Sequence, residues 1–260
     1  MRQIVLLKDI PDLTEIKLDT QTRAPIVKGV KRRISEVDKR ALEATLRLKE
    51  KAGGELVALS MGDDQTKTAL LEALAMGADA AYIVDDPRLR DVDTNATSRV
   101  LEAAIGHIGE YDLIVAGEMT LDSLSSQIGP RLAQLLGIPQ ITYVKEFDVV
   151  DGKVRAVRDL EDVDEVVEAS LPAVVCVVRE IHEPRIPNLM SIMRAKKKPQ
   201  TVWAAEDIGL DASEVKEVSF VEVMSATVPK VERKQVRIEA ETVEATAAKL
   251  VEALAQEGVI

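Results

Sequence analysis

The sequence is poor in the residues that build covalent and metal centres. Cys176 is the only cysteine among 260 residues, which excludes an intramolecular disulfide framework and a multi-cysteine metal or iron–sulfur site. It stands inside an apolar run, so we expect a small buried hydrophobe. The two histidines, His107 and His182, lack HExxH-type spacing. We therefore predict no metal site and no catalytic residue in this chain.

Aromatic residues and positive charge are also scarce. Phe, Trp and Tyr make up 2% of the chain, too few for the base-stacking surfaces of single-strand binders. The net charge of −11 argues against nucleic-acid binding, because neutralising phosphates needs an excess of Lys and Arg on one face. The one strongly basic run is Lys196–Lys198.

Long apolar runs are missing as well. None approaches the roughly 20 residues that cross a bilayer, so we expect no transmembrane segment. The first apolar stretch, Ile4–Leu7, is followed at once by Lys8 and Asp9 and lacks a signal-peptide cleavage site. We expect a cytoplasmic protein that reaches a membrane complex, if at all, through its partners.

Short apolar runs alternate with segments of helical spacing through the first two thirds of the chain. Strands are predicted at 4–7, 56–59, 81–84, 113–116 and 171–178, and helices at 36–51, 63–76, 93–108 and 125–136. Strands without polar positions are buried on both faces, which is typical of a parallel sheet covered by helices on both sides. The fold class is therefore α/β, with a mostly parallel sheet.

Three segments depart from this pattern. Residues 14–30 alternate around a turn near 19–23, which indicates a small hairpin or an extended arm. Residues 142–170 are charge-rich and contain Asp151-Gly152, a hairpin signal, so we expect a small antiparallel excursion there. From residue 200 the periodicity weakens until a helix at 241–257. We predict a domain over 1–199 and an extended C-terminal arm over 200–260.

Ligands of open parallel sheets bind beyond the carboxyl ends of the strands, which directs attention to four turns. The turns are Lys8–Pro11, Ser60–Asp64, Asp85–Thr97 and Gly117–Pro130. The last presents hydroxyls at a helix start, where unpaired N–H groups favour anions, and its Gly129 would let a ligand approach closely. Thr94 and Thr97 offer hydroxyls at another helix start. Ordinary helix capping is the alternative for both turns.

Several well-known sites are absent from the sequence. It has no GxGxxG fingerprint, no GxxxxGK[ST] loop and no GxSxG elbow, so a conventional dinucleotide, NTPase or hydrolase site is not supported. The stretch Leu171–Pro199 instead turns from a buried strand into a proline-stiffened loop with exposed apolar residues. That loop either folds back on its own domain or docks another protein.

Four ordered segments carry a family resemblance. They are ALEATLRLKE (Ala41–Glu50), LLEALAMGADAAYIV (Leu70–Val84), SSQIGP with GIPQITYV (Ser125–Val144), and LPAVV…EPRIPNLMSIMRAKKKP (Leu171–Pro199). Together they resemble the beta subunit of electron transfer flavoproteins, the EtfB/FixA family, over essentially the whole chain. The resemblance implies a Rossmann-like, adenine nucleotide alpha-hydrolase-like domain, a heterodimer with an alpha subunit, and a C-terminal arm that wraps that subunit.

The resemblance also implies particular site residues. The nucleotide-binding positions would be Leu6, Ser35, Asp38, Met61, Asp93, Thr94, Thr97, Asp122, Ser123, Leu124, Ser125, Ser126, Gln127, Ile128 and Gly129. A recognition loop near 183–195 would dock a partner dehydrogenase or quinone reductase through Glu183, Arg185, Leu189, Met190, Ile192 and Met193, with Leu189 as the anchor.

The resemblance leaves two cofactors open. Conventional members hold a structural AMP in the beta subunit, whereas electron-bifurcating members hold an FAD reduced by NADH. The turn DTNATSR and the motif SSQIGP resemble the bifurcating group and favour FAD. Asp122-Ser123-Leu124-Ser125 and Ser35-Glu36 depart from the family pattern and keep AMP as the alternative. Any oxidoreductase activity would belong to the complex with the alpha subunit.

Overall fold

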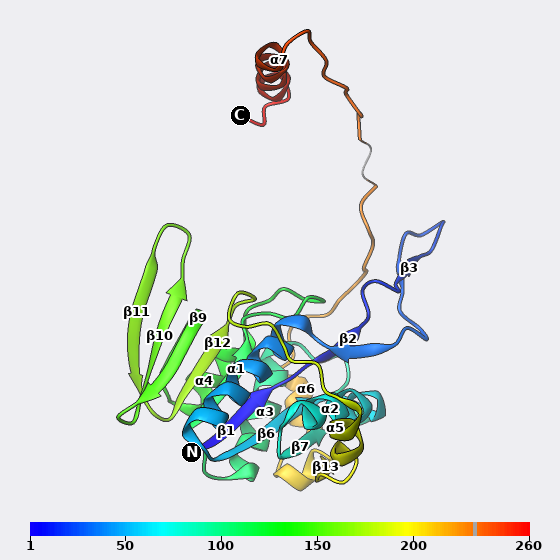
Figure 1. The fold of residues 1–260 in the computed structure, drawn as a ribbon. Helices are drawn as coiled ribbons and strands as arrows, with labels where there is room; N and C mark the ends of the chain where they lie inside the picture. The colour runs from blue at the N-terminus through cyan, green and yellow to red at the C-terminus, as the bar shows by residue number, and fades with distance from the viewer. Residues whose placement is uncertain (231–232) are drawn as a thin grey trace. The chain divides into compact units, whose positions relative to one another are not determined.

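The computed structural model describes residues 1–230 and 233–260, and two compact units are distinguished in it. The first comprises residues 1–17 and 25–226, and the second 18–24 and 227–260. Figure 1 traces their elements. The expected boundary after residue 199 therefore differs from the observed one, because residues 200–226 belong to the first unit.

A nine-stranded sheet organises the first unit (Figure 1). Its order is β11 (Asp164–Ser170), β10 (Lys153–Asp159), β9 (Gln140–Val150), β12 (Ala173–Val177), β8 (Leu113–Gly117), β1 (Arg2–Leu6), β6 (Glu55–Met61), β7 (Ala80–Val84) and β13 (Gln200–Trp203). The seven strands from β9 to β13 pair in parallel, and only β9–β10 and β10–β11 are antiparallel. The predicted α/β class with a small antiparallel excursion is confirmed.

The hairpin predicted at Asp151-Gly152 is also present, between β9 and β10. Asp151 and Gly152 both have positive φ, 51° and 73°, which matches the type I′ turn that joins twisted antiparallel strands. A second hairpin is formed by β3 (Lys17–Leu18) and β4 (Pro25–Ile26), and β2 (Asp9–Pro11) pairs with β5 (Arg32–Ile34).

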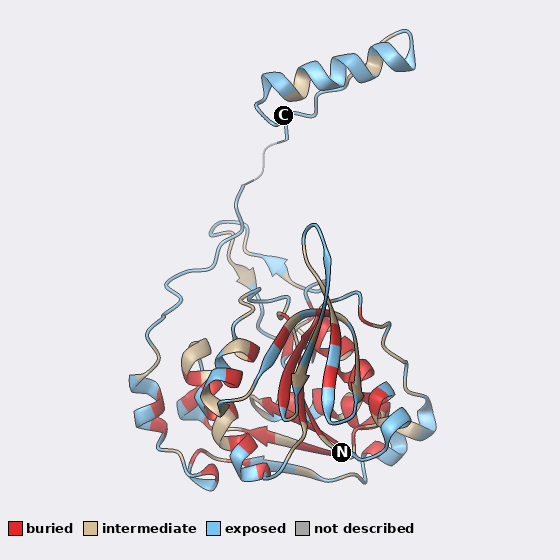
Figure 2. Cartoon of the chain, turned by 90° about the vertical axis from the view of Figure 1, so that its left-hand side faces the viewer, coloured by how far each residue is buried: buried red, intermediate tan, exposed pale blue. Residues whose placement is uncertain are grey.

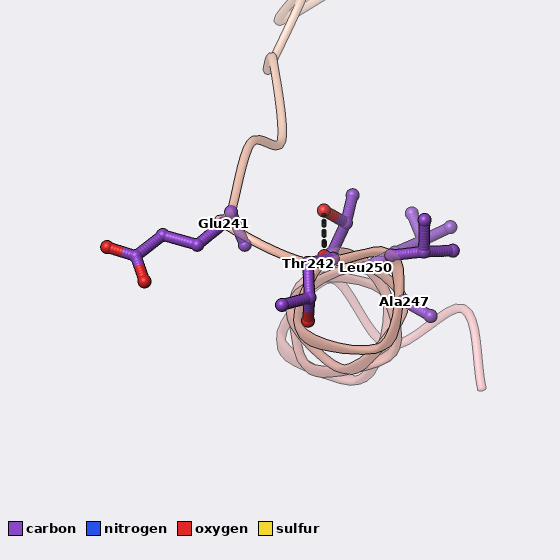
Figure 3. A pocket seen from close by; sticks show the side chains of 7 residues that line it. Glu241, Thr242, Ala247 and Leu250 are labelled. Atoms are coloured by element: carbon purple, nitrogen blue, oxygen red, sulfur yellow. Dashed lines mark hydrogen bonds between the residues drawn. The ribbon is translucent and has the colours of Figure 1, made fainter.

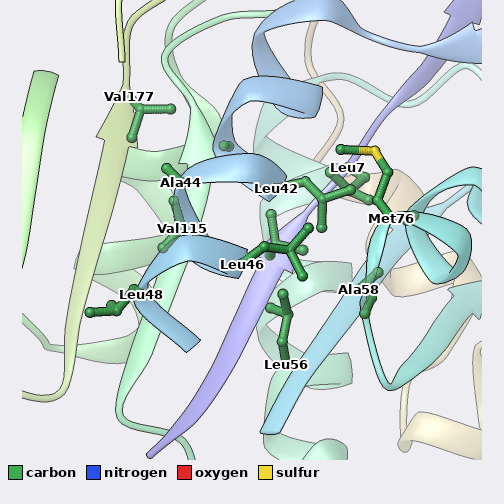
Figure 4. Close-up of a cluster of buried hydrophobic side chains, with 14 of the residues drawn as sticks. Leu7, Leu42, Ala44, Leu46, Leu48, Leu56, Ala58, Met76, Val115 and Val177 are labelled. Atoms are coloured by element: carbon green, nitrogen blue, oxygen red, sulfur yellow. The ribbon is translucent and has the colours of Figure 1, made fainter. Parts of the chain in front are cut away.

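Alternation along the central strands divides the core into two layers. On one face Val5 and Leu7 pack with α1 (Glu36–Ala52) and α2 (Asp64–Met76); Figure 4 shows Leu42 and Leu46 of α1 in this cluster. On the other face Ile4 and Leu6 pack with α3 (Thr94–Ile108), α4 (Ile128–Leu136) and α6 (Ala212–Glu217). The buried residues gather in the sheet and the inner helix faces, as Figure 2 shows.

The chain after residue 199 departs from the expected arm because it completes this core. Strand β13 pairs with β7, and Trp203 stacks on Tyr82 with ring centroids 4.7 Å apart. Buried residues follow at Ala205, Ile208 and Val215. Short helices η1 (Pro87–Leu89), η2 (Glu206–Ile208) and α5 (Leu189–Ala195) complete the unit, and α5 packs beside α2.

The described residues of the second unit form one helix and little core. Helix α7 (Val243–Gln256) is capped by Thr242 and contains no buried residue in this structure. Ala247 and Leu250 project from one side of it, beside an open hollow of about 430 Å³ (Figure 3). Within the same unit, Arg23 donates from Nε to the Val228 carbonyl oxygen at 2.8 Å.

Candidate functional site: a strand-end nucleotide site and an exposed docking segment

The strand order of the sheet reverses between β1 and β8. The Asp38 carboxylate hydrogen-bonds to backbone N–H groups at the ends of both strands. Asp38, in the first turn of α1, accepts from the Lys8 N–H at 2.8 Å and from the Gly117 N–H at 3.2 Å. Lys8 follows β1 and Gly117 ends β8, so Asp38 joins the two strand ends where open α/β sheets bind ligands. Burial raises the pKa of Asp38 to about 7, although both backbone bonds act to lower it.

Gly117 is required by this arrangement. A Cβ atom on Gly117 would lie 2.4 Å from Asp38 Oδ1 and within about 3 Å of the backbone of α1. The carboxylate can therefore reach the end of β8 only because residue 117 has no side chain. Asp38 thus positions the two strand ends, and its carboxylate oxygens are used by the protein backbone.

The turn after β8 is held in an unusual backbone conformation. Leu124 and Ser126 both have positive φ, 51° and 52°, which non-glycine residues rarely adopt. At its start Asp122 pairs with Lys8, with Oδ2 2.7 Å from Nζ, and the Ser123 and Thr120 hydroxyls lie 3.0 Å apart. Burial acts to raise the pKa of Asp122, but the hydrogen bonds from Lys8 and Thr120 and the charge of Lys8 together outweigh it, so the net shift is downward.

The two turns singled out in the sequence meet at this site. Thr94 Oγ1 donates to Gln127 Oε1 at 2.7 Å. Arg131 donates from Nε to the same oxygen at 3.0 Å and from Nη1 to Asn95 Oδ1 at 3.2 Å. The starts of α3 and α4 are therefore joined side by side, with one guanidinium between them.

The helix starts around the site differ in capping. Asp63 caps α2 and Asp93 caps α3, whereas Ser35 of α1 and Gln127 of α4 make no side-chain cap bond in the described part of the chain. An uncapped start keeps its N–H groups available and favours an anion. The anion-binding capacity of the site therefore resides in α1 and α4.

Asp93 has a second structural role. Its Oδ1 accepts from Ala96 N, and its Oδ2 accepts from the Phe220 and Val221 N–H groups at 2.8 and 3.2 Å. Asn95 donates to the Val218 carbonyl oxygen at 2.8 Å. This helix start thus fixes the segment that leaves α6, and the structure places Asp93 as a cap and anchor beside the site.

The other predicted residues lie at the strand ends in different environments. Leu6 is buried at the end of β1, Met61 is half-buried at the end of β6, and Thr97 is half-buried on the first turn of α3. The buried Ser35 hydroxyl has no hydrogen-bond partner among the described residues. Ile128 begins α4, where it packs against the core.

Gly129 serves packing in this structure. A Cβ atom there would lie 2.1 Å from Cys176 Sγ, so the glycine lets α4 lie directly on β12. This differs from the expected close approach of a ligand, because the contact is with the sheet. Cys176 itself is buried, as expected.

The sequence marked the turns that contain Lys8 and Glu118 but did not indicate the partners of these two residues. Lys8 pairs with Asp122, and buried Glu118 accepts from the Tyr143 N–H at 2.9 Å, where Tyr143 has a φ of 56°. Burial raises the pKa of Glu118, opposed by that bond and by Arg158. A charged residue directly after an apolar strand is the local signal in both turns, and the partners are remote in sequence.

Asp9 and Asp63, in the other two candidate turns, are engaged elsewhere. Asp9 accepts from Thr66 Oγ1 at 2.7 Å and pairs with Arg32 at 2.6 Å. Asp63, after β6, forms a capping box with Thr66. Both turns therefore fasten α2 and the β2–β5 pair to the sheet.

The docking segment, residues 183–195, presents apolar side chains on and before α5. Leu189 is 73% exposed, and Ile186, Met190, Ile192 and Met193 are also exposed. Glu183 and Arg185 are instead bound to α1: Arg40 pairs with Glu183, and Glu43 pairs with Arg185. The six predicted docking residues thus divide into two ion-paired residues and four exposed apolar ones.

The basic run after α5 is not uniform. Lys196 and Lys197 are exposed, whereas Lys198 donates to the carbonyl oxygens of Leu74 and Ala78 at 2.9 and 2.6 Å. Burial lowers the pKa of Lys198. Lys198 therefore caps the end of α2, which leaves Lys196 and Lys197 beside the apolar group.

Residues 1–230 and 233–260 contain no cluster of three or more His, Cys, Asp and Glu side chains suited to a metal ion. No helix in that part of the chain is long and apolar enough to cross a membrane.

Comparison with known proteins identifies the family. Residues 26–208 match the electron transfer flavoprotein domain family. The chain is 36% identical to an electron transfer flavoprotein subunit beta from Thermoanaerobacterium thermosaccharolyticum over 235 residues, 90% of each chain. It is 37% identical over 211 residues to subunit CarD of the caffeyl-CoA reductase–Etf complex from Acetobacterium woodii, covering 81% of this chain and 80% of the relative. This chain belongs to the electron transfer flavoprotein beta subunit family.

Proposed function

We propose that this chain holds an FAD at the strand-end site and, with an alpha subunit, transfers and bifurcates electrons. The donors would be NADH or dehydrogenases, and the electrons would pass to downstream acceptors. The observation that carries the proposal is the 2.7 Å hydrogen bond from Thr94 to Gln127. It joins two polar turns into one lining beyond the strand ends, where nucleotides bind in such sheets.

The residues at this site fit a nucleotide with a diphosphate. The uncapped starts of α1 and α4 supply N–H groups, and the Ser125 and Ser126 side chains are partly exposed and hydrogen-bond no described residue. Lys8 and Arg131 supply positive charge close to the phosphates' expected position. FAD, when bound, would supply the redox chemistry, and the chain's own groups would bind and orient it.

The extent of the polar lining favours FAD over AMP. AMP would need only the starts of α1 and α4, whereas the Thr94 and Thr97 turn extends the lining to α3.

The released ligand tests this choice. The chain is co-expressed with its alpha subunit, and the heterodimer is purified. We expect the denatured heterodimer to release two FAD molecules, identified by absorbance and mass. The intact heterodimer should be reduced by NADH. Thr94→Val should lower the flavin content, whereas Thr68→Val, an exposed hydroxyl on α2, should not. One FAD with one AMP, and no reduction by NADH, would establish the AMP alternative.

We also propose that the Leu189 segment docks a partner dehydrogenase or quinone reductase. Its support is the group of four exposed apolar side chains on one short helix, because such groups mark interaction sites. Leu189→Ala should lower the rate of electron transfer from the partner without loss of cofactor. Val166→Ala, an exposed apolar residue on β11, is the control.

The second unit suits the proposed contact with the alpha subunit. Helix α7 has no buried residue in the chain by itself, although it carries Leu250, Val251 and Leu254. We propose that residues 227–260 form the arm that wraps the alpha subunit. Deleting them should abolish co-purification of the heterodimer, and retained co-purification would contradict this role.

A further inference from the structure

Two buried charges of α1 hold the loop that precedes the docking segment. Arg40, whose side chain is 6% exposed, donates from Nη1 to the carbonyl oxygens of Arg179 and His182 at 2.8 and 2.9 Å. Its Nη2 lies 2.9 and 3.1 Å from the two carboxylate oxygens of Glu183. One guanidinium thus binds three residues of the loop, which its fixed fork of donors allows.

Glu43 binds the next turn of the same loop. Its carboxylate, 2% exposed, accepts from Arg185 three times: from the backbone N–H at 3.1 Å, Nε at 2.7 Å and Nη2 at 3.2 Å. Burial acts to raise the pKa of Glu43, and the bonds from Arg185 and Arg47 outweigh it, so the carboxyl stays ionised. Both the backbone and the side chain of Arg185 are therefore fixed to α1.

The exposed part of the docking segment lies between two such attachments. Only Ile186, Pro187 and Asn188 separate Arg185 from Leu189, and Asn188 caps α5. At the other end Ala195 is buried, and Lys198 is bound to the end of α2. The segment is thus fastened on both sides while its apolar residues remain in solvent.

We propose that Arg40 and Glu43 are positioning residues for docking, holding Leu189 and its neighbours in the conformation that the partner enzyme binds. The proposal rests on the proposed docking role of Leu189. A loop fixed before binding loses less conformational freedom when the partner arrives, which raises affinity. Without these bonds the apolar side chains would be free to cover themselves on the chain's own surface. Partner affinity therefore depends on charges that never touch the partner.

Hydrogen exchange of the heterodimer tests the positioning directly. In Glu43→Gln we expect backbone exchange in residues 183–195 to rise about tenfold, because a neutral amide replaces a charge-assisted acceptor. Arg47→Gln is the matched control: Arg47 binds Glu43 at 2.8 Å from a side chain that is 53% exposed and forms no hydrogen bond to the loop among the described residues. Wild-type exchange in Glu43→Gln would overturn the proposal.

Kinetics with a short-chain acyl-CoA dehydrogenase that reduces the wild-type heterodimer test the consequence for docking. Glu43→Gln should raise the KM for the heterodimer about tenfold and leave kcat within about twofold, since only the encounter is affected. Faster exchange with an unchanged KM would overturn the positioning role. If Leu189→Ala also left KM unchanged, the proposed docking function itself would fail, which separates the two failures.

A second variant covers the case in which Glu43→Gln does not fold. Arg185→Gln removes the side-chain bonds to Glu43, together with those to Glu50, from the loop side, where the side chain is 32% exposed. It should give the same rise in exchange and in KM with an unchanged flavin content. Normal exchange in Arg185→Gln would overturn the proposal equally.

Discussion

The strand-end site and the docking segment use buried charge in the same way but present opposite surfaces. At the site, Asp38 and Glu118 are buried and accept backbone N–H groups, and the starts of α1 and α4 have no side-chain cap in the described part of the chain. Under the docking segment, Arg40 and Glu43 are buried, and apolar side chains face solvent. In both regions a buried ionisable side chain fixes the backbone, and the proposed ligand or partner would meet other residues.

This comparison predicts where stability resides. The strand-end groups lie inside the core, so changes there should lower the free energy of unfolding of the heterodimer. The tip of the docking segment contacts little, so changes there should affect partner binding alone. Four substitutions, measured by urea denaturation, would break or sharpen this contrast.

The largest effect is expected for Gly117→Ala. The added methyl group would meet the Asp38 carboxylate and the backbone of α1, which cannot move aside cheaply. We expect the free energy of unfolding to fall by about 3 kcal/mol, as for other overpacked sites. Gly106→Ala, in an exposed part of α3 with no atom within 4 Å, should instead raise it by about 0.5–1 kcal/mol. Equal effects would contradict the assigned role of Gly117.

A pH dependence is expected from Asp38. Its pKa of about 7 in the folded chain exceeds the ordinary 3.8, so the folded chain binds the proton more tightly. Its contribution to stability is full below the ordinary pKa and is lost as the pH rises through about 7. Between pH 5 and pH 8, wild type should therefore lose about 2 kcal/mol relative to Asp38→Asn. Parallel pH profiles of the two proteins would refute this.

A smaller effect is expected for Asp93→Ala, which removes a helix cap and an anchor together. The free energy of unfolding should fall by about 1.5 kcal/mol, and by less in Asp63→Ala, which removes a capping box and two long ion pairs, with Arg32 at 3.9 Å and Arg90 at 4.0 Å. Hydrogen exchange at Phe220 and Val221 should rise in Asp93→Ala alone, since only Asp93 accepts from those N–H groups.

The smallest effect on stability is expected for Leu189→Ala. Because the side chain is largely exposed, the free energy of unfolding should change by less than about 0.5 kcal/mol. Leu42→Ala on the buried side of α1 is the contrasting variant and should cost about 2–5 kcal/mol. A large loss in Leu189→Ala would mean that the segment belongs to the core.

The fold was largely predictable because its signals are local. The residues that make up an apolar run such as Ala173–Val177, or a turn such as Asp151-Gly152, are consecutive in sequence. Such signals can be recognised without knowledge of distant partners. Strand β13 was missed because QTVW is short and half-exposed, and only its pairing with β7 identifies it. The C-terminal arm was therefore expected to begin at residue 200, whereas the second unit resumes at residue 227.

The positions of the candidate turns at the strand ends could be predicted from the sequence, but the hydrogen-bond partners of their side chains could not. The strand-end turns were found from topology, but the partners of individual side chains are remote in sequence. Arg185 meets Glu43, and Asp93 meets Phe220, through contacts between elements that sequence spacing does not relate. Gly129 likewise faces Cys176 across a helix–sheet contact. The residue types at these positions suggested contacts with a ligand or partner, whereas in the structure these residues contact other elements of the chain.

The contact between Gly129 and Cys176 makes local opening of the native chain measurable through the reactivity of the Cys176 thiol. The thiol is sealed between α4 and β12, and burial raises its pKa, so a thiol reagent can reach it only when the helix leaves the sheet. Since the chain has a single cysteine, no engineering is needed. The labelling rate of Cys176 would report how often α4 separates from β12 in the native protein.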